Sequence, residues 1–516
     1  MAVLPLLITL LSIIFFASSP LAKAAQYSVL SYGAMPDGKT DSTKAFAAAW
    51  SQACASTQPA TISVPKGSFA LGQVRFQGPC KNNAILVRID GTLVAPSDYG
   101  VLGKAQNWLI FEHVNGVTIS GGTLDGQGAG LWSCKNSGKD CPSGATSLEF
   151  SNSNNIAITG LASLNSQMFH IVINACQDVN VQGVRVSAAG DSPNTDGIHV
   201  QSSTGVTILN SRIGTGDDCV SIGPGTSNLW IENVACGPGH GISIGSLGKD
   251  SQEAGVQNVT VKTSTFTGTE NGVRIKTWGR PSNGFARNIL FQHAVMTNVQ
   301  NPIVIDQNYC PGEKGCPGQV SGVKISDVTY QDIHGSSATE LAVKFDCSKT
   351  NPCSGITLED VKLTYNNQPA EASCSNAGGV ASGVEHAGGR KRDNKNKSKH
   401  RSLSVSSSGY ISSLRRKKRE SHRSYSSSSD ESSDSGMESD SNDKSRRRRF
   451  RKNSLSSNDR RRRRMYSSFS DESSDSDSGF ESDSDEKISS LSSDESSNSD
   501  PGPESDSVDK SNRRRS

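Results

Sequence analysis

The stretch from Asp196 to Ile244, DGIHVQSSTGVTILNSRIGTGDDCVSIGPGTSNLWIENVACGPGHGISI, contains one short motif three times. Each copy is a polar start followed by alternating apolar residues: DGIHV from Asp196, DCVSI from Asp218 and HGISI from His240, with starts 22 residues apart. A fourth copy, NGVRI from Asn271, follows the insertion GKDSQEAG. Alternation of apolar and other residues over such short runs predicts β-strands.

A second strand motif recurs over a longer part of the chain, as a turn-like Asn, Asp or Gly followed by β-branched residues. GVTI, NIAI, DVNV and NVTV are examples, and the series is centred on Val117, Ile156, Val179, Val206, Leu229, Val259, Ile289, Val323 and Ile356. Successive centres are 39, 23, 27, 23, 30, 30, 34 and 33 residues apart. Periods of this length predict an all-β solenoid of the parallel β-helix type. A β-sandwich would instead place turns every 8 to 12 residues or so.

One period in a parallel β-helix brings a residue directly above its counterpart, about 4.8 Å away. We therefore expect Asp196, Asp218 and His240 to stack as a polar column on one exposed face, with Asp217 beside it. Strand alternation points eight apolar side chains into the core: Ile198, Val200, Val220, Ile222, Ile242, Ile244, Val273 and Ile275. The same alternation points five polar side chains outward: His199, Ser221, Ser243, Arg274 and Lys276.

The expected column suits cleavage of a glycosidic bond. That reaction needs one protonated carboxyl group for the leaving oxygen and a second carboxylate that activates water or attacks directly. Clustered like charges raise the pKa of at least one member, which keeps a proton available. Arg274 and Lys276 suit a substrate that carries carboxylates. Taken singly, each residue is typical of a solvated surface, and it is the shared register that favours a functional site.

Four segments of the chain also resemble the signature segments of polygalacturonases. They are NTDGIHV (194–200), GDDC (216–219), GHGISIGS (239–246) and RIK (274–276). Polygalacturonases are pectin-cleaving glycoside hydrolases with a right-handed parallel β-helix. The resemblance covers residues 26–384, and GTLVAPSDYG and ISGGTLDGQGAGLW further resemble plant, pollen-type exopolygalacturonases.

The resemblance implies hydrolysis of α-1,4-galacturonosyl bonds of pectin with inversion, by terminal release of galacturonic acid. Asp217 would be the general acid, Asp196 and Asp218 would activate water, and His240 would maintain their protonation. Substrate would be held by Asn194, Arg274, Lys276 and Tyr309. No cofactor is implied, and a metal is disfavoured because the two cations would oppose it. The alternatives are an endo-polygalacturonase, a rhamnogalacturonan hydrolase, a calcium-dependent pectate lyase and a non-catalytic wall-binding β-helix.

The N-terminus and the cysteines indicate an extracellular protein. Residues 1–24 combine an apolar run with a small-residue site, which predicts a cleaved secretory signal, a buried helix being the alternative. All twelve cysteines lie between Cys54 and Cys374, and no CxxC pair suggests zinc. The spacing predicts five disulfides, Cys54–Cys80, Cys134–Cys141, Cys219–Cys236, Cys310–Cys316 and Cys347–Cys353. Cys176 and Cys374 remain unassigned. We expect a secreted monomer in the cell wall, with no membrane partner.

The sequence changes character after the predicted β-helix domain, residues 25–385. Residues 386–516 are rich in Ser, Arg, Asp and Glu, and YSSSSDESSDS at Tyr425 recurs as YSSFSDESSDS at Tyr466. So few apolar residues predict a disordered tail. Its basic clusters resemble those of Ser/Arg-rich nuclear tails, whereas the folded domain is not expected to bind nucleic acid. A gene model that joins two genes is the favoured explanation, and a pectin-binding tail or a nuclear protein are the alternatives.

Overall fold

The computed structural model describes residues 24–311, 316–384 and 401–403. The predicted signal, apart from residue 24, and the predicted tail, apart from residues 401–403, lie outside the described residues. No helix within the described ranges is long and apolar enough to cross a membrane.

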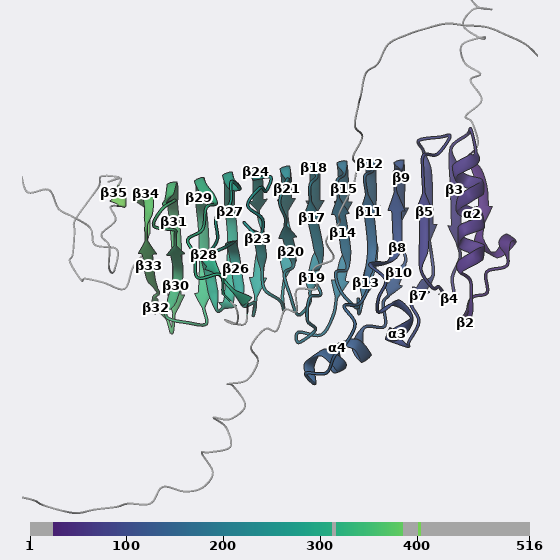
Figure 1. Ribbon diagram of the computed structural model, residues 1–516, viewed down its shortest axis with the longest axis horizontal. Coiled ribbons are helices and arrows are strands. Elements are labelled where there is room, and N and C mark those ends of the chain that lie inside the picture. Colours follow the sequence, from purple (N-terminus) through teal and green to yellow (C-terminus); the bar gives the residue numbers. More distant parts are fainter. Residues whose placement is uncertain (1–23, 312–315, 385–400, 404–516) are drawn as a thin grey trace, which may run out of the picture. The chain divides into compact units, whose positions relative to one another are not determined.

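The described strands stack in three parallel ladders, in which each coil of the chain adds its strands to those of the coil before (Figure 1). Ladder 1 comprises β1 (Ala25–Ser28), β3 (Ala60–Val64), β6 (Ile85–Ile89), β9 (Asn115–Ser120), β12 (Asn154–Thr159), β15 (Gln177–Gln182), β18 (Thr204–Leu209), β21 (Ser227–Glu232), β24 (Val256–Lys262), β27 (Phe285–Val299), β29 (Lys324–Ser337), β31 (Cys353–Tyr365) and β34 (Ala377–Ser382). Ladder 2 comprises β2 (Asp37–Asp41), β4 (Ser68–Ala70), β7 (Thr92–Val94), β10 (Thr123–Asp125), β13 (Ala162–Leu164), β16 (Arg185–Ser187), β19 (Arg212–Gly214), β22 (Ala235–Cys236) and β25 (Thr265–Thr267). The long strand β27 pairs with both β24 and β25 and so joins the two ladders.

Ladder 3 forms a sheet of its own and carries the repeated motif. Its strands are β5 (Val74–Gln77), β8 (Asn107–Glu112), β11 (Thr146–Ser151), β14 (Ile171–Asn174), β17 (Ile198–Gln201), β20 (Val220–Ile222), β23 (Ile242–Leu247), β26 (Asn271–Trp278), β28 (Asn301–Tyr309), β30 (Leu341–Asp346) and β33 (Glu371–Ser375). Two short strands pair antiparallel, β32 (Gln368–Pro369) with β31 and β35 (Arg401–Leu403) with β34. The predicted parallel β-helix is therefore confirmed.

The register of ladder 3 is the one that the repeat predicts. Ile198 pairs with Val220, Val220 with Ile242, and Ile242 with Val273. All eight side chains predicted to point into the core are 0% exposed. Stacked β-branched residues thus form a continuous core along the coils, and the alternate residues of the same strands face outward.

Left-handed backbone residues set the position of the buried apolar pair in nine strands of ladder 1. In these nine strands the residue before the apolar pair has a positive φ: Gly116, Asn155, Asp178, Gly205, Asn228, Asn258, Asn288, Asp327 and Gly355. Gly, Asn and Asp adopt this conformation at least cost, which explains the recurring turn residue in the sequence. Stacked turns also bond to one another, because the Asn258 side-chain amide donates to Asn228 at 3.0 Å and that of Asn288 donates to Asn258 at 3.2 Å.

One member of the predicted series is wrong. Ile289 pairs with Val328, and Val328 pairs with Ile356, so that Val328 and not Val323 occupies this place in ladder 1. Val323 directly precedes β29 and is buried. The left-handed residue decides between the two, since Asp327 has φ 56° and directly precedes Val328.

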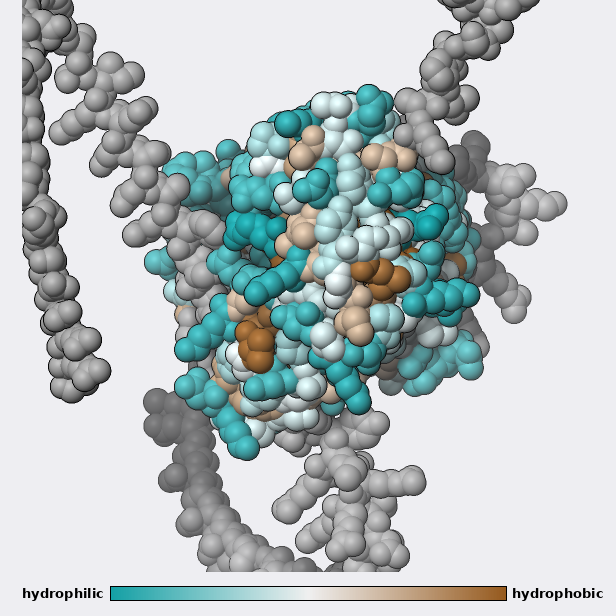
Figure 2. All heavy atoms as spheres, turned by 90° about the vertical axis from the view of Figure 1, so that its right-hand side faces the viewer, coloured by the Kyte–Doolittle hydropathy of each residue, from teal (hydrophilic) through white to brown (hydrophobic). Residues whose placement is uncertain are grey.

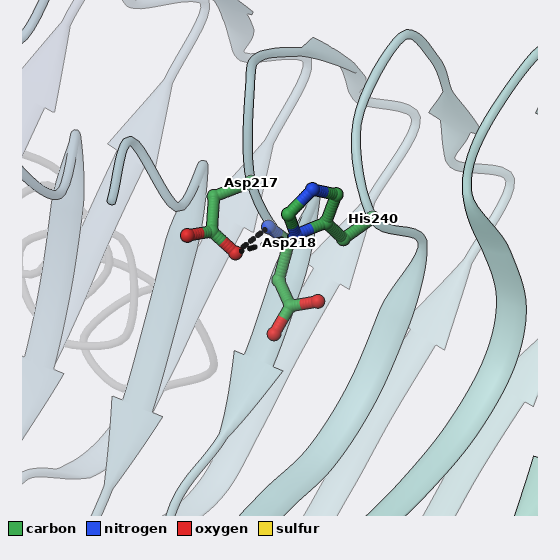
Figure 3. A group of neighbouring side chains, drawn as sticks. All are labelled: Asp217, Asp218 and His240. Atoms are coloured by element: carbon green, nitrogen blue, oxygen red, sulfur yellow. Dashed lines mark hydrogen bonds and ion pairs between the residues drawn. The ribbon is translucent and has the colours of Figure 1, made fainter. Parts of the chain in front are cut away.

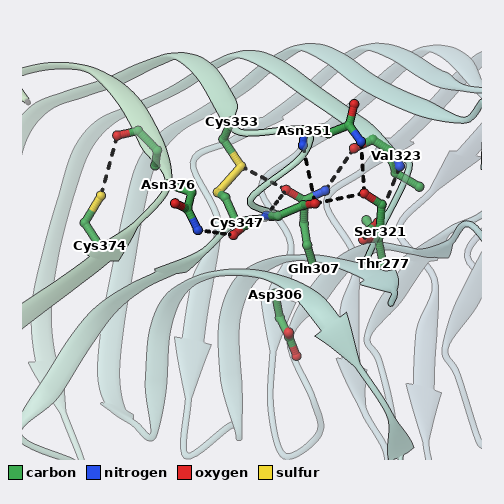
Figure 4. Close-up of a disulfide and its surroundings, with 12 residues drawn as sticks. Thr277, Asp306, Gln307, Ser321, Val323, Cys347, Asn351, Cys353, Cys374 and Asn376 are labelled. Atoms are coloured by element: carbon green, nitrogen blue, oxygen red, sulfur yellow. Dashed lines mark hydrogen bonds between the residues drawn. A yellow bond between two sulfur atoms is a disulfide. The ribbon is translucent and has the colours of Figure 1, made fainter. Parts of the chain in front are cut away.

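All five predicted disulfides are present: Cys54–Cys80, Cys134–Cys141, Cys219–Cys236, Cys310–Cys316 and Cys347–Cys353. Cys176 is buried and free, and Cys374 is free and half-buried. Figure 4 shows Cys347–Cys353 beside Gln307, whose amide donates to the Val323 carbonyl at 2.9 Å. Side-chain bonds and a disulfide therefore fasten the last coils together.

Helix α2 (Thr43–Ala55) covers the N-terminal end of the core, and it follows the 3-10 turn η1 (Val29–Tyr32). Its buried face includes Phe46 and Trp50, and the Trp50 ring lies edge-on to Phe76 at 5.4 Å. From this end most of the surface is hydrophilic or intermediate, with hydrophobic residues in small separate patches (Figure 2). The remaining described helices, α3 (Tyr99–Leu102) and α4 (Ala129–Asn136), lie in connections between coils.

Replacement of a core residue tests the stacking. Ile208 in β18 is 0% exposed, so Ile208→Ala should lower the free energy of unfolding by about 2 to 5 kcal/mol, through lost apolar burial and the cavity left behind. The neighbouring Thr207→Ala, on the outward side of the same strand, should change it by less than about 0.5 kcal/mol. Urea unfolding followed by fluorescence measures both. Equal losses in the two variants would contradict the inward orientation of Ile208.

Candidate active site

The outward-facing residues of ladder 3, together with the turns that lead into its strands, are called the active face below. Register places Asp196, Asp218 and His240 on successive coils, each two residues before a paired core position. Their backbones are bonded across coils, because the Gly197 amide donates to the Asp218 carbonyl at 2.9 Å and the His240 amide to that of Asp217 at 2.8 Å. Residues far apart in the sequence are thereby brought to one place.

Asp217 and His240 form a hydrogen-bonded ion pair (Figure 3). His240 Nδ1 lies 3.1 Å from Asp217 Oδ1, and both side chains are 18% exposed. Burial alone would raise the pKa of Asp217, but the hydrogen bond and the positive charge of His240 lower it below its usual range. Burial likewise opposes the charge on His240, yet Asp217, with Glu270 behind it, raises the pKa of His240 to about 9. The free protein therefore keeps this proton on His240.

Asp218 is held by two cations and a hydroxyl group. Arg274 and Lys276 each place a nitrogen 3.0 Å from a different oxygen of Asp218. Ser243 donates a hydrogen bond to Asp218 at 2.7 Å, and Arg274 Nε in turn donates to Ser243 at 3.1 Å. Burial disfavours both cations, but chiefly the charge of Asp218 raises the pKa of Arg274 and of Lys276. This network fixes one carboxylate in a defined orientation.

Asp196 has the opposite electrostatic character. Burial raises the pKa of Asp196 well above its usual value, and the charges of Asp217 and Asp218 raise it further. A hydrogen bond from Ser221 and the charge of Lys276 oppose this without overcoming it. Asp196 and Asp217 thus differ in charge, with Asp196 favouring its protonated form and Asp217 its ionised form.

The turns beside the aspartates require glycine at specific positions. Gly239 and Gly241, on either side of His240, have φ of 142° and 89°. A Cβ atom on Gly239 would lie 2.6 Å from the Asp217 carbonyl, and one on Gly241 would lie 2.2 Å from the Asn271 carbonyl. The GHG sequence therefore lets His240 approach Asp217 closely.

The predicted substrate-holding residues differ in how the structure places them. Arg274 and Lys276 reach the aspartates, and Lys276 Nζ lies 5.1 Å from the centre of the Tyr309 ring, which brings Tyr309 to the same site. Asn194 adopts a left-handed turn, φ 56°, two residues before Asp196. Its position is thus tied to that of Asp196 through the backbone.

The expectation of an exposed ladder of carboxylates is wrong in one respect. Asp196 is 7% exposed and Asp218 only 1%. The long side chains of Arg274 and Lys276 explain the difference for Asp218, since they bend back onto it and cover it. Sequence alternation predicted which side of the strand these residues occupy, but not that they contact one another.

Two features of the site escaped the sequence analysis. Glu270 Oε2 lies 3.4 Å from His240 Nε2 and completes the surroundings of that ring. Phe169, on the coil before Asp196, stacks on His199, and the two ring centres are 5.1 Å apart. Glu270 directly precedes the NGVRI motif and could have been found by extending the stacked column by one residue, because register sets it above Gly239.

One oxygen or nitrogen each of Asp217, Asp218 and His240 lies within 4.8 Å of the others, a spacing that could hold a metal ion. The donors fit a cation poorly, however. Lys276 and Arg274 already occupy both oxygens of Asp218, and His240 carries a proton on the side of Asp217. The side chains of Arg274, Lys276 and His240 therefore supply the positive charge that a metal ion would bring.

A solenoid face that holds neighbouring carboxyl groups in different protonation states, with cations beside them, has the chemical requirements for glycosidic bond hydrolysis. The fold and the site define a glycoside hydrolase of the parallel β-helix class. Residues 54–384 match the family model described as Glycosyl hydrolases family 28, and the chain belongs to this family. Residues 26–74 also match a model described as Rhamnogalacturonase A/epimerase, pectate lyase-like.

Curated relatives cover the same part of the chain. A polygalacturonase of Prunus persica is 73% identical over 372 residues, which are 72% of this chain and 95% of the relative. An exopolygalacturonase of Platanus acerifolia is 45% identical over 364 residues, 70% of this chain and 96% of the relative. The predicted resemblance to the polygalacturonase family is therefore confirmed.

Solved structures share the fold at low sequence identity. An exopolygalacturonase from Thermotoga maritima superposes with a TM-score of 0.59 at 19% identity, covering 72% of this chain and 94% of the other. An endo-xylogalacturonan hydrolase from Aspergillus tubingensis superposes with a TM-score of 0.61 at 22% identity, covering 68% of this chain and 96% of the other. At such identities the likeness shows the fold alone.

The shifted pKa of His240 predicts a pH-dependent contribution to stability. Because this pKa rises from 6.5 to about 9 on folding, the contribution is fully present below about pH 6.5 and is lost as pH rises through about 9. The difference in unfolding free energy between the wild type and His240→Gln should therefore fall by about 3 kcal/mol over this interval. Urea titrations at a series of pH values measure it. Asp217→Asn should remove most of this dependence, and a constant difference would refute the ion pair.

Proposed function

We propose that the protein is a secreted polygalacturonase that hydrolyses α-1,4-galacturonosyl bonds of pectin with inversion, releasing galacturonic acid from chain ends. The observation that carries the proposal is the set of three aspartates with His240, Arg274 and Lys276, in a chain of family 28. Two cations next to the carboxyl groups suit a substrate unit that is itself an acid. Release from chain ends draws support from the Platanus acerifolia exopolygalacturonase.

In the proposed mechanism Asp217 donates a proton to the leaving oxygen, while Asp196 and Asp218 activate a water molecule on the opposite side. In the free protein the proton lies on His240, so His240 and Asp217 together act as the acid. Transfer along the 3.1 Å hydrogen bond from Nδ1 to Oδ1 loads Asp217 when the substrate displaces water from the pair. Asp218 orients the water, and Asp196, after releasing its own proton to solvent, accepts the proton of that water.

Arg274, Lys276, Tyr309 and Asn194 hold the sugar and its carboxylate in this proposal. The cations that bind Asp218 in the free protein have further donors, because guanidinium carries five N–H groups and ammonium three. They can thus bridge Asp218 and a substrate carboxylate. Tyr309 lies beside Lys276 and presents a half-buried ring to the same sugar.

The domain organisation is part of the proposal. A signal at residues 1–24 would direct the chain out of the cell, and five disulfides in the described part suit an oxidising compartment. Residues 25–385 would form the catalytic domain, since the family match ends at residue 384. Residues 386–516 would be an appended tail.

Product analysis on oligogalacturonides of defined length tests the function. The expected products are galacturonic acid and the substrate shortened by one unit, formed equally well with a chelator present. Proton NMR of the nascent sugar should show the inverted anomer. An ultraviolet-absorbing unsaturated product that requires calcium would show a lyase and refute the proposal.

Substitution of the acid tests the mechanism. Asp217→Asn should lower kcat by about 10² to 10⁴, because an amide cannot deliver the proton, with a smaller change in KM. The matched control is Asp332→Asn on β29, which removes an exposed carboxylate on ladder 1. Reducing-sugar assays measure both variants. Activity of Asp217→Asn within a factor of two or so of wild type would exclude Asp217 as the acid.

A further inference from the structure

Glu149 lies on the active face, on the N-terminal side of the aspartates. Register in ladder 3 sets Glu149 beside Val172, and Val172 beside His199. At about 4.8 Å per strand, Glu149 is therefore roughly 10 Å from His199, along the column that continues to Arg274. The aspartates and the cations follow one another across coils. A linear polymer that contacts both and extends along this column passes over Glu149.

The surroundings of Glu149 contain no cation that neutralises it alone. Among the described residues, the cation that acts on its charge is Arg75 on β5, and Arg75 forms an ion pair with Glu112 on β8. The other polar neighbours are the neutral amides of Asn107 and Asn174. Asn107 is 6% exposed, and its Oδ1 has no hydrogen-bond partner. The Asn107 amide N–H donates to the Glu149 carboxylate and favours its ionised form.

A polymer of acidic sugars thus meets cations on one side of the aspartates and an acidic residue on the other. Towards the C-terminus, Arg274 and Lys276 attract a carboxylate. Towards the N-terminus, beyond Phe169 and His199, the polymer meets Glu149 and the neutralised pair of Arg75 with Glu112. A uronate unit at that position is tolerated or repelled according to the charge of Glu149.

That charge changes near neutral pH. Burial raises the pKa of Glu149 to about 7, and the charge of Glu112 contributes, against the amides of Asn174 and Asn107 and the charge of Arg75. Below about pH 7 the carboxyl group is neutral and can donate a hydrogen bond to a substrate carboxylate. Above it, two negative charges face each other. On the next coil towards the aspartates, the titratable side chains are His170 and Cys176, on either side of β14, and His199 on β17 lies one coil further on.

We propose that Glu149 is a specificity-determining residue that admits a galacturonate unit to the N-terminal side of the active face only while its own carboxyl group is protonated. The inference rests on the proposed function, since it takes the polymer to be a polyuronate. When Glu149 is protonated, more than one unit can lie on this side of the cleaved bond, and longer products are released. When Glu149 is ionised, binding is restricted to the terminal unit, and galacturonic acid alone is released.

The test compares wild type with Glu149→Gln on pentagalacturonate labelled at its reducing end. At low conversion, chromatography gives the ratio of longer products to galacturonic acid at about pH 5 and about pH 8. The same catalytic groups form both products, so the ratio cancels their titration. The wild-type ratio should fall about tenfold, equivalent to about 1.4 kcal/mol, and that of Glu149→Gln should stay high. Glu232→Gln on β21, outside the active face, is the matched control and should follow the wild type.

A wild-type ratio that does not change with pH, or a Glu149→Gln ratio that changes equally, would overturn the inference. Calorimetric binding of trigalacturonate to Asp217→Asn, with and without Glu149→Gln, gives a readout that needs no turnover. Affinity should fall about tenfold more between the two pH values when Glu149 is present, and parallel losses would overturn the inference. If the wild type released no product while this difference persisted, the proposed function would fail and the role of Glu149 would stand.

Discussion

The parallel register between successive coils is the constraint on which everything else in this structure depends. Each coil can add its strand in register only if the chain turns at the same place, and a left-handed Gly, Asn or Asp provides that turn ahead of the apolar pair in nine strands of ladder 1. Because side chains alternate along a strand, a slip by one residue would exchange core and surface positions. It would turn Val220 outward and Ser221 inward and would break up the column of acidic residues.

Register also explains why the site tolerates so much buried charge. Asp218 sits almost wholly out of water, which would be strongly unfavourable for an unpaired carboxylate. Arg274 and Lys276 come from the second coil beyond it and reach the same carboxylate only because β20, β23 and β26 are stacked. Fixed partners replace hydration, and they hold the charges in one geometry before any substrate arrives.

Neighbouring aspartates have the same side chain, and their pKa values differ because their contacts differ. Asp217 has His240 as a partner, and its pKa falls, whereas Asp196 has chiefly negative neighbours and a buried position, and its pKa rises. The pKa of Glu149, two coils before His199, is likewise raised by burial and a negative neighbour. One repeated strand motif thus supplies acidic groups of several kinds along a single face. The division of roles within a hydrolase follows from what lies above and below each group.

The sequence by itself determined the fold class, the inward residues of the repeated motif and the five disulfides. All of these depend on local patterns: alternation, turn residues and short spacings that survive in one dimension. It misplaced Val323, because two apolar segments lie close together and only pairing with Ile289 selects Val328. Tertiary structure alone decided that Arg274 and Lys276 fold back onto Asp218, that Glu270 backs His240, and which carboxyl groups hold a proton. Those outcomes depend on distances between coils and on burial, and neither is encoded at any single position.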